Sequence, residues 1–325
     1  MSFFRTLGVA ALLATTALAA LADDTARPTI RAAVLEAGTV NWELTVLSEK
    51  GLDAENGFTL AVQPYASNDA TRIATEGGEA DVFVADWIWV ARQNADGKDY
   101  RFIPYSTAVG GLVVPGDSPA QTLADLKGQK IGIAGGPLDK SWLILRAYAQ
   151  QEYGMDLAAE TEQVYGAPPL IFKSALGGEM GGAINFWHFL AKMKAAGMRS
   201  LVDVQEAATA LGLDPDTPLL GYVVKQSFID AHPEVVAGFA RASQDAKTLM
   251  AEDDALWDIV RPQMNAQNDA QFAALRDDFR SGIPESYVVD EAAADKLLKL
   301  MGELGGEELV GKATSLPAGL FYSAE

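Results

Sequence analysis

The sequence predicts an α/β protein with two lobes, parallel sheets, two strands that cross between the lobes, and a helical C-terminal tail packed on the first lobe. Two series of alternating strands and helices predict the lobes, one on each side of a strand-rich break at residues 102–114. Beyond Gln226 the pattern becomes wholly helical, which predicts the tail. The length of 325 residues also suits two domains better than one.

Within the first series, short apolar runs predict strands and the polar-apolar stretches between them predict helices. Gly51 and the pair Gly77-Gly78 stop two of these helices. The run at residues 81–85 is continuously apolar after Asp81, as expected for a strand buried on both faces. The expected strands are 30–35, 58–64 and 81–85, and the expected helices are 41–50, 69–76 and one that begins at Asp86.

The second series follows the extended stretch and ends before the tail. Its strands are expected at 130–134, 162–165, 182–185, 200–204 and 219–225, with helices at 141–153, 170–176 and 188–196. The tail helices are expected at 233–250, 255–264, 269–279 and 290–304. The resulting division is residues 28–109 plus 226–325 for lobe 1 and 110–225 for lobe 2, with crossing strands near 110–114 and 219–225.

Residues 1–22 have the pattern of a secretory leader. Arg5 precedes an Ala/Leu-rich segment, and Ala20-Leu21-Ala22 is typical of a cleavage site. The segment is shorter than the ~20 residues that span a bilayer. Because the sequence contains no cysteine, the lipid attachment of bacterial lipoproteins is not expected. We therefore expect a soluble periplasmic protein, and we expect it to be a monomer.

Composition disfavours several classes of function. The net charge of −19 is unsuited to nucleic acid or anionic lipid, which need cationic surface. With no cysteine and two histidines, a thiolate or histidine metal site is not expected, and neither is a cofactor. No nucleophile elbow, zinc-protease motif or phosphate-binding loop is present, so no catalytic residue is assigned.

Ligands of open parallel sheets bind beyond the carboxyl ends of the strands, which identifies the candidate site residues. The central stretch is GIAGGPLDKSW at residues 132–142, where a strand, a glycine turn and a helix N-terminus meet. Four tryptophans lie at or beside such strand ends, which favours an aromatic cleft. The predicted contacts are Trp42, Asp86, Trp87, Gly136, Pro137, Asp139, Lys140, Ser141, Tyr165, Asn185 and Trp187.

Several alternatives stay open for these residues. Asp86 and Asp139 are each either helix N-caps or ligand contacts. As an acid/base pair they would instead indicate an exported enzyme. Lys140 and Ser141 favour an anionic group on the solute, whereas the aromatic residues and carboxylates favour a flat, apolar or cationic one. A sensor or scaffold subunit that binds protein is a third class. His188 is expected to be structural.

Three stretches resemble the nitrate/sulfonate/taurine group of periplasmic solute-binding proteins, which includes alkanesulfonate and thiamine-pyrimidine binders. They are GTVNWELTVLSEKGLDAENGF (38–58), GGEADVFVADW (77–87) and DLKGQKIGIAGG (125–136). The runs GGPLDKSW, GAPPL and NFWH resemble one subgroup of these binders.

The resemblance implies a type II periplasmic-binding-protein fold, a cleft that closes on a small organic solute, and delivery to an ABC permease with its ATPase. It places cleft contacts on Trp42, Asp86, Trp87, the 136–141 corner, Asn185 and Trp187. Sulfonate binders of this group favour hydroxyl, amide or arginine donors, whereas one strand here ends in Asp86. A heterocyclic or amphipathic solute is therefore expected, with a sulfonate- or taurine-type anion as the alternative. The related fungal pyrimidine-synthesising enzymes depend on a cysteine-rich motif that this sequence lacks.

Overall fold

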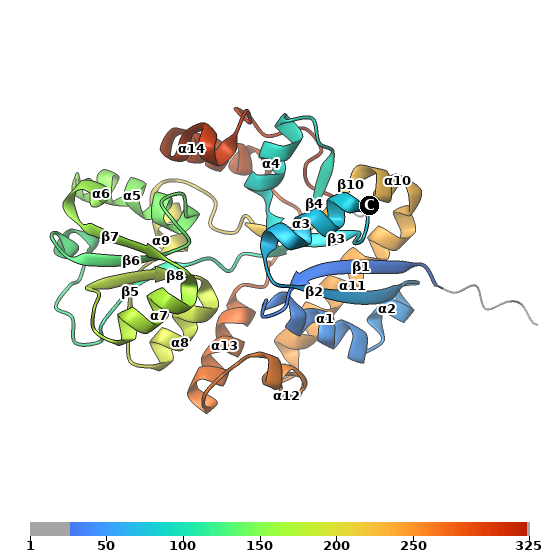
Figure 1. Cartoon of the computed structure of the whole chain (residues 1–325), viewed down its shortest axis with the longest axis horizontal. Helices are drawn as coiled ribbons and strands as arrows, with labels where there is room; N and C mark the ends of the chain where they lie inside the picture. Colours follow the sequence, from blue (N-terminus) through green and yellow to red (C-terminus); the bar gives the residue numbers. More distant parts are fainter. Residues whose placement is uncertain (1–26, 324–325) are drawn as a thin grey trace, which may run out of the picture.

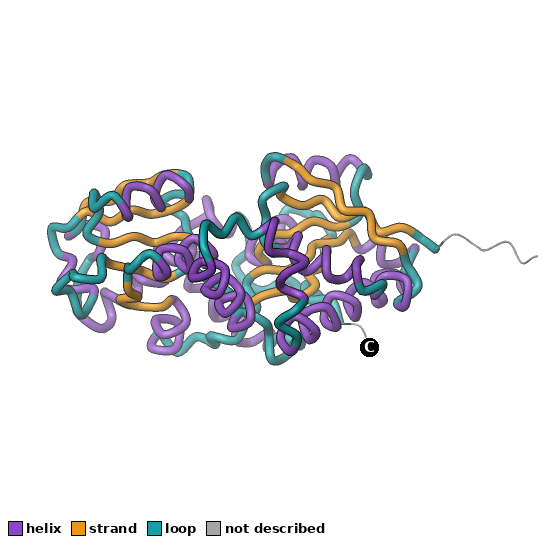
Figure 2. The backbone as a smooth tube through the Cα atoms, turned by 90° about the horizontal axis from the view of Figure 1, so that it is seen from below, coloured by secondary structure: helices purple, strands orange, loops and turns teal. Residues whose placement is uncertain are grey.

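The computed structural model describes residues 27–323 as two α/β lobes side by side (Figure 1). The predicted leader at residues 1–22 lies outside this range. Figure 2 shows each lobe as a separate stack of strands, with helices and loop segments between the stacks.

Each lobe is built on a five-stranded sheet with helices on its faces. The lobe 1 sheet has the order β2-β1-β3-β10-β4, and the lobe 2 sheet has the order β7-β6-β8-β5-β9. The strands are β1 (Thr29–Leu35), β2 (Thr59–Tyr65), β3 (Val82–Asp86), β4 (Tyr100–Ser106), β5 (Gly111–Val114), β6 (Lys130–Ala134), β7 (Glu162–Gly166), β8 (Gly182–Asn185), β9 (Arg199–Asp203) and β10 (Leu220–Lys225).

The helices alternate with the strands up to β10 and then form the tail. Those of the alternating part are α1 (Val40–Glu49), α2 (Leu52–Glu55), α3 (Asn68–Gly77), α4 (Trp87–Ala95), η1 (Leu123–Leu126), α5 (Lys140–Tyr153), α6 (Leu157–Glu160), α7 (Pro168–Leu176), α8 (Trp187–Ala195) and α9 (Val204–Ala210). Those of the tail are α10 (Gln226–Ala231), α11 (Pro233–Glu252), α12 (Leu256–Val260), η2 (Arg261–Gln263), α13 (Asp269–Ser281) and α14 (Glu291–Val310). No helix within residues 27–323 has the length and apolarity needed to cross a membrane.

The sheets are mixed rather than wholly parallel. In lobe 1, β10 pairs antiparallel with β3 and β4, and in lobe 2, β5 pairs antiparallel with β8 and β9. Each of these strands enters its sheet directly from the other lobe, without a crossover helix, and therefore runs against its neighbours. The sequence division at residue 225 placed β10 with the second lobe, whereas the structure places it inside the lobe 1 sheet.

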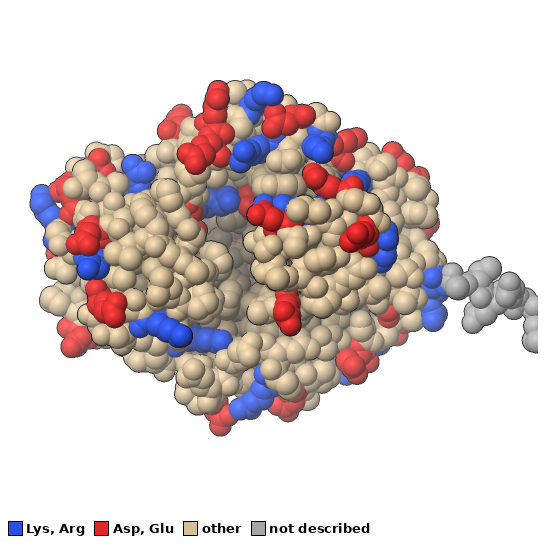
Figure 3. Space-filling model, in the orientation of Figure 1, with Lys and Arg blue, Asp and Glu red and all other residues tan. Residues whose placement is uncertain are grey.

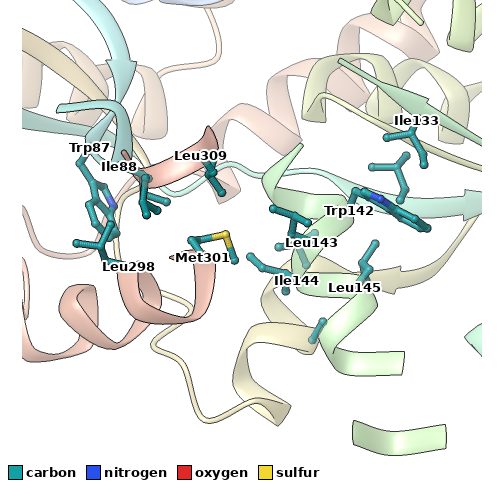
Figure 4. Packing of buried hydrophobic residues seen from close by; sticks show 14 of the residues in the cluster. Trp87, Ile88, Ile133, Trp142, Leu143, Ile144, Leu145, Leu298, Met301 and Leu309 are labelled. Atoms are coloured by element: carbon teal, nitrogen blue, oxygen red, sulfur yellow. The ribbon is translucent and has the colours of Figure 1, made fainter. Parts of the chain in front are cut away.

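The helical tail contacts both lobes rather than the first alone. Helix α11 packs on α1 within lobe 1, but α13 packs on α8 of lobe 2, and α14 lies between α4 and α5. Figure 4 shows this last contact, where Ile88 of α4 and Met301 of α14 face Ile144 of α5. The tail thus connects the lobes on two sides, in addition to the two linkers at residues 107–110 and 211–219.

Lobe 1 contains a buried ion pair in its core. Glu43 of α1 and Lys247 of α11 form a salt bridge, with side chains 0% and 1% exposed. Glu43 Oε1 also accepts hydrogen bonds from Ser243 Oγ at 2.6 Å and Tyr222 Oη at 3.0 Å. Burial lowers the pKa of the Lys247 ammonium, against the raising effect of the Glu43 carboxylate. This network fixes α1 against α11 and β10.

Candidate functional site

The carboxyl ends of the parallel strands in the two lobes face each other. The segments after β6 and β8 of lobe 2 both contact lobe 1, through Lys140–Asp86 and Trp187–Trp42. Between the lobes the molecular surface is deeply hollowed (Figure 3). We call this hollow the cleft, and it lies where parallel α/β sheets bind their ligands.

Asp86 and Lys140 form an ion pair across the cleft. Asp86 is the N-cap of α4, and its Oδ1 accepts a hydrogen bond from the Trp89 backbone N–H at 2.9 Å. Its Oδ2 accepts another from Lys140 Nζ, also at 2.9 Å. The two side chains are 14% and 26% exposed, so the pair is partly screened by water. Both predicted residues are brought together, and each already has a partner in the protein.

The turn that starts at Gly135 leads into α5, and Asp139 caps this helix. Gly135 has φ +96°, a left-handed conformation that favours glycine. Asp139 caps α5, since its Oδ1 accepts a hydrogen bond from the Trp142 backbone N–H at 3.0 Å. Burial raises the pKa of Asp139, whereas the Trp142 N–H and the neighbouring Lys140 act to lower it. Asp139 therefore acts as a cap in this structure, one of the two roles left open by the sequence.

The linker between β4 and β5 passes close to this corner. A Cβ added to Gly110 would lie 2.8 Å from Ser141 Oγ and 2.7 Å from the Asn185 carbonyl oxygen, so only glycine fits there. Of the other corner residues predicted from the sequence, Gly136 is half-buried and Pro137 is exposed. The corner therefore adjoins both the cleft and the linker.

Two of the predicted tryptophans lie in the core and not on the cleft surface. Trp42 is 3% exposed and packs among Trp257 and Phe279. Trp87 is 0% exposed, and Figure 4 shows its indole beside Leu298 of α14. Trp142 is also buried, in the lobe 2 core. An aromatic wall made by Trp42 and Trp87 is not what the structure shows, because the tail helices cover both indoles.

Trp187 is the half-buried tryptophan of the predicted set. It approaches Trp42 edge-on, with ring centroids 5.8 Å apart, and also contacts Phe279 of α13. Lys194 of the same helix bonds Asp278 of α13 at 2.8 Å. Trp187 thus belongs to a contact between the lobes as well as to the end of β8.

Asn185 and Tyr165 have different surroundings. Asn185 is 2% exposed, and its Nδ2 donates to the Pro168 carbonyl at 3.0 Å while its Oδ1 accepts from the Phe186 backbone N–H at 2.8 Å. Its amide therefore ties the start of α7 to the end of β8. Tyr165, near the end of β7, is 40% exposed.

Two exposed apolar residues at the same edge were not among the predicted contacts. Phe186 follows β8 directly and is 44% exposed, and Leu170 in the first turn of α7 is 56% exposed. The runs NFWH and GAPPL contain both, so position after a strand was an available signal.

His188 is a structural residue in this arrangement. Its ring lies 4.7 Å from that of Phe189 and 5.6 Å from that of Trp187. Burial, together with the charge of Lys192, lowers the pKa of His188 to about 4. It is therefore neutral at pH 7. Across residues 27–323 no group of three or more histidine, aspartate or glutamate side chains is arranged to hold a metal ion.

Comparisons with known proteins agree with the arrangement of the two lobes. The family model described as "NMT1/THI5 like" matches residues 42–255. The structure is similar to that of the periplasmic aliphatic sulphonate binding protein SsuA from Escherichia coli, with a TM-score of 0.69, 15% identity, and coverage of 89% of this chain and 92% of that one. No curated protein sequence matches the chain.

Two further solved structures show the same fold. The alkanesulfonate-binding protein SsuA from Xanthomonas axonopodis pv. citri, bound to MOPS, has a TM-score of 0.65 and 16% identity, covering 91% of this chain and 99% of that one. A putative sulfonate-binding protein of an ABC transporter from Methylobacillus flagellatus has a TM-score of 0.66 and 16% identity, with coverage of 91% and 92%. At these identities the likeness establishes the two-lobed periplasmic-binding-protein fold.

Proposed function

Because the chain belongs to the NMT1/THI5-like family, we propose that it is the exported solute-binding component of an ABC importer. In this proposal it captures a small organic solute between its lobes in the periplasm and presents it to a membrane permease that works with an ATPase. The observation that carries the proposal is the cleft itself, formed where the strand ends of two similar sheets face each other.

The proposed mechanism is a shift of the population from open to closed lobes. A solute that contacts both strand edges stabilises the closed form by its extra contacts there. Micromolar affinity requires ~8 kcal/mol, which a few aromatic contacts and hydrogen bonds supply. Contacts that join the lobes, such as Asp86–Lys140, would then form or tighten on closure.

The exported-enzyme alternative rests on Asp86 and Asp139, and both carboxylates are engaged. Asp86 pairs with Lys140 and caps α4, while Asp139 caps α5. Neither is placed as a free acid or base, which favours binding without turnover. The likeness to sulfonate-binding proteins keeps a sulfonate- or taurine-type anion as the alternative to a heterocyclic or amphipathic solute.

Native mass spectrometry of protein purified from the exported fraction tests the proposal. We expect one small molecule bound per chain, released unchanged on denaturation. Titrating the released compound back should change tryptophan fluorescence, because Trp42 and Trp187 meet between the lobes. A compound converted to product would support the enzyme instead. Tight binding to a receptor by protein that holds no small molecule would support the scaffold class.

A further inference from the structure

Three large, exposed side chains lie near the carboxyl ends of the lobe 2 strands β7 and β8. Tyr165 at the end of β7, Leu170 in the first turn of α7 and Phe186 after β8 are 40%, 56% and 44% exposed. We call these three residues the lobe 2 apolar patch. Large apolar side chains with such exposure at a ligand-binding edge indicate a contact surface rather than a core.

The patch is held in place by the surrounding backbone. Strands β7 and β8 both run parallel to β6, so their carboxyl ends meet at one edge. The Asn185–Pro168 hydrogen bond joins the two loops that carry the patch. Leu170 lies against Gly166, where an added Cβ would approach Leu170 Cδ2 to 3.1 Å. The patch is therefore preorganised at the same edge whose neighbouring segments already contact lobe 1.

Of the six helix N-termini that follow parallel strands, four are capped by a side chain or begin with proline. Helices α3, α4 and α5 are capped by the side chains of Ser67, Asp86 and Asp139. Helix α7 begins with Pro168-Pro169, which have no backbone N–H to donate. Helices α1 and α8 have no side-chain cap, and their first turns meet through Trp42 and Trp187.

The charges at the cleft also disfavour an anion. Lys140 is neutralised by Asp86 at 2.9 Å. On the lobe 1 edge, the exposed Glu36 follows β1 directly, and its backbone N–H bonds the carbonyl of Tyr65 at the end of β2. An anionic solute that used Lys140 would have to displace Asp86 from it. It would then lie beside the unpaired Asp86 carboxylate, at a cost in free energy.

From these observations we infer that the solute is amphipathic and carries no anionic group, with its apolar face against Tyr165, Leu170 and Phe186. In this assignment Asp86 and Lys140 pair with each other across the closed lobes and do not bind the solute. The inference rests on the proposed solute-binding function and specifies the chemical class of its ligand. It distinguishes this chain from a binder of simple sulfonates.

A matched pair of probes tests the charge requirement. Benzenesulfonamide is uncharged at pH 7, and benzenesulfonate has the same ring with a negative charge. Isothermal titration of the purified protein should show at least tenfold tighter binding of the sulfonamide. Tighter or equal binding of benzenesulfonate overturns the inference. Where neither probe binds, the electrophoretic mobility at pH 7 of the compound found by native mass spectrometry decides: migration as an anion overturns the inference, and its absence supports it.

Three variants, titrated with the bound probe or the released compound, test the assigned residues. The double variant Tyr165→Ala/Phe186→Ala should weaken binding at least tenfold. Leu176→Ala is the matched control, because Leu176 is 40% exposed at the opposite end of α7 and its replacement should leave affinity unchanged. Asp86→Asn should weaken binding of an uncharged solute, because it breaks the interlobe pair. It would strengthen binding of an anion by freeing Lys140, and that result overturns the inference.

The failure of this inference and of the proposed function are distinguishable. A bound anion contradicts the ligand class and leaves the binding function intact. If no small molecule accompanies the protein and neither probe binds, the proposed function fails and the inference fails with it.

Discussion

Two ion pairs in this protein have the same chemistry and opposite surroundings. Glu43–Lys247 lies inside lobe 1 with both side chains at most 1% exposed, whereas Asp86–Lys140 spans the cleft with side chains 14% and 26% exposed. The first is buried from water. Its charges are compensated by each other, by the hydroxyls of Ser243 and Tyr222, and by the ring of Tyr105, whose centroid lies 4.1 Å from Lys247 Nζ. The second can exchange its partners for water at little cost.

Because of this difference, we expect the buried pair to affect the stability of lobe 1 and the cleft pair to affect opening and closing of the lobes. The buried pair holds α1 on α11 and is expected to persist whether the lobes are open or closed. The half-buried pair joins elements of different lobes, so it breaks when they separate. Because water screens this pair, it can break and re-form with little change in free energy.

The largest effect is expected when one partner of the buried pair is removed. Lys247→Met leaves the Glu43 charge uncompensated in the core and should lower the free energy of unfolding by about 3–5 kcal/mol. Adding Glu43→Gln should recover most of this loss, because glutamine is uncharged and can still bond Tyr222 and Ser243. Urea unfolding measures both. A cost of under ~1 kcal/mol for Lys247→Met would show that water reaches this core and would remove the contrast between the two pairs.

The second largest loss of stability is expected at the aromatic contact of Trp187 between the lobes. This contact is apolar, whereas Asp86–Lys140 is ionic. Trp187→Ala removes the contacts with Trp42 and Phe279 and should cost about 2–3 kcal/mol of stability, less than a fully buried tryptophan. Phe186→Ala is the control, because Phe186 is 44% exposed and its removal should cost under ~1 kcal/mol. Equal losses for both variants in urea unfolding would mean that Trp187 does not anchor α8 on lobe 1.

The sequence predicted the fold well because local patterns specify regular elements. Strands β6 and β8 begin and end where their apolar runs do, at Lys130–Ala134 and Gly182–Asn185. The short helices α2, α6, α9 and α10 were not predicted, since four to seven residues carry too little periodicity. The crossing strand near 219–225 was expected in lobe 2 and lies in the lobe 1 sheet, because strand order depends on contacts between distant segments.

The candidate site was less accessible to sequence reasoning for the same physical reason. Position after a strand selects Asp86 and Lys140, which form an ion pair in the structure, but it cannot tell whether a tryptophan faces solvent. Trp87 is covered by α14, which lies some two hundred residues later in the chain. Glu43 likewise acquires its buried partner Lys247 from α11. Both outcomes are decided by how the tail packs, which no local pattern contains.

The third prediction concerns the pH dependence of stability that His188 causes beside Trp187 in the lobe contact. Burial holds the pKa of His188 near 4 in the folded chain, against about 6.5 when unfolded. Between these pH values the unfolded state therefore binds more protons than the folded state. The contribution of His188 to the free energy of unfolding is at its maximum above about pH 6.5 and decreases as the pH falls toward 4.

Between about pH 6.5 and 4, His188 should lower the free energy of unfolding by roughly 1–3 kcal/mol. Comparing the pH dependence of urea unfolding for wild type and His188→Gln isolates it from the carboxylates, which titrate in both proteins. Parallel curves would contradict the burial of the imidazole against Trp187 and Phe189.

The smallest effect on stability is expected at the interlobe pair. Asp86→Asn, Lys140→Met and the double variant form a mutant cycle, and their coupling in urea unfolding should be under ~1 kcal/mol because water screens the pair. Asparagine retains the α4 cap, so the cycle measures the ion pair and not the helix terminus.

We expect the same variants to change lobe closure more than they change the free energy of unfolding. Small-angle scattering with bound benzenesulfonamide should give a larger radius of gyration for each single variant than for wild type. The double variant should be no more open than either single variant, because one contact is lost in all three. A coupling in unfolding as large as that of Glu43–Lys247 would show that the interlobe pair stabilises the fold and is not a contact made on closure.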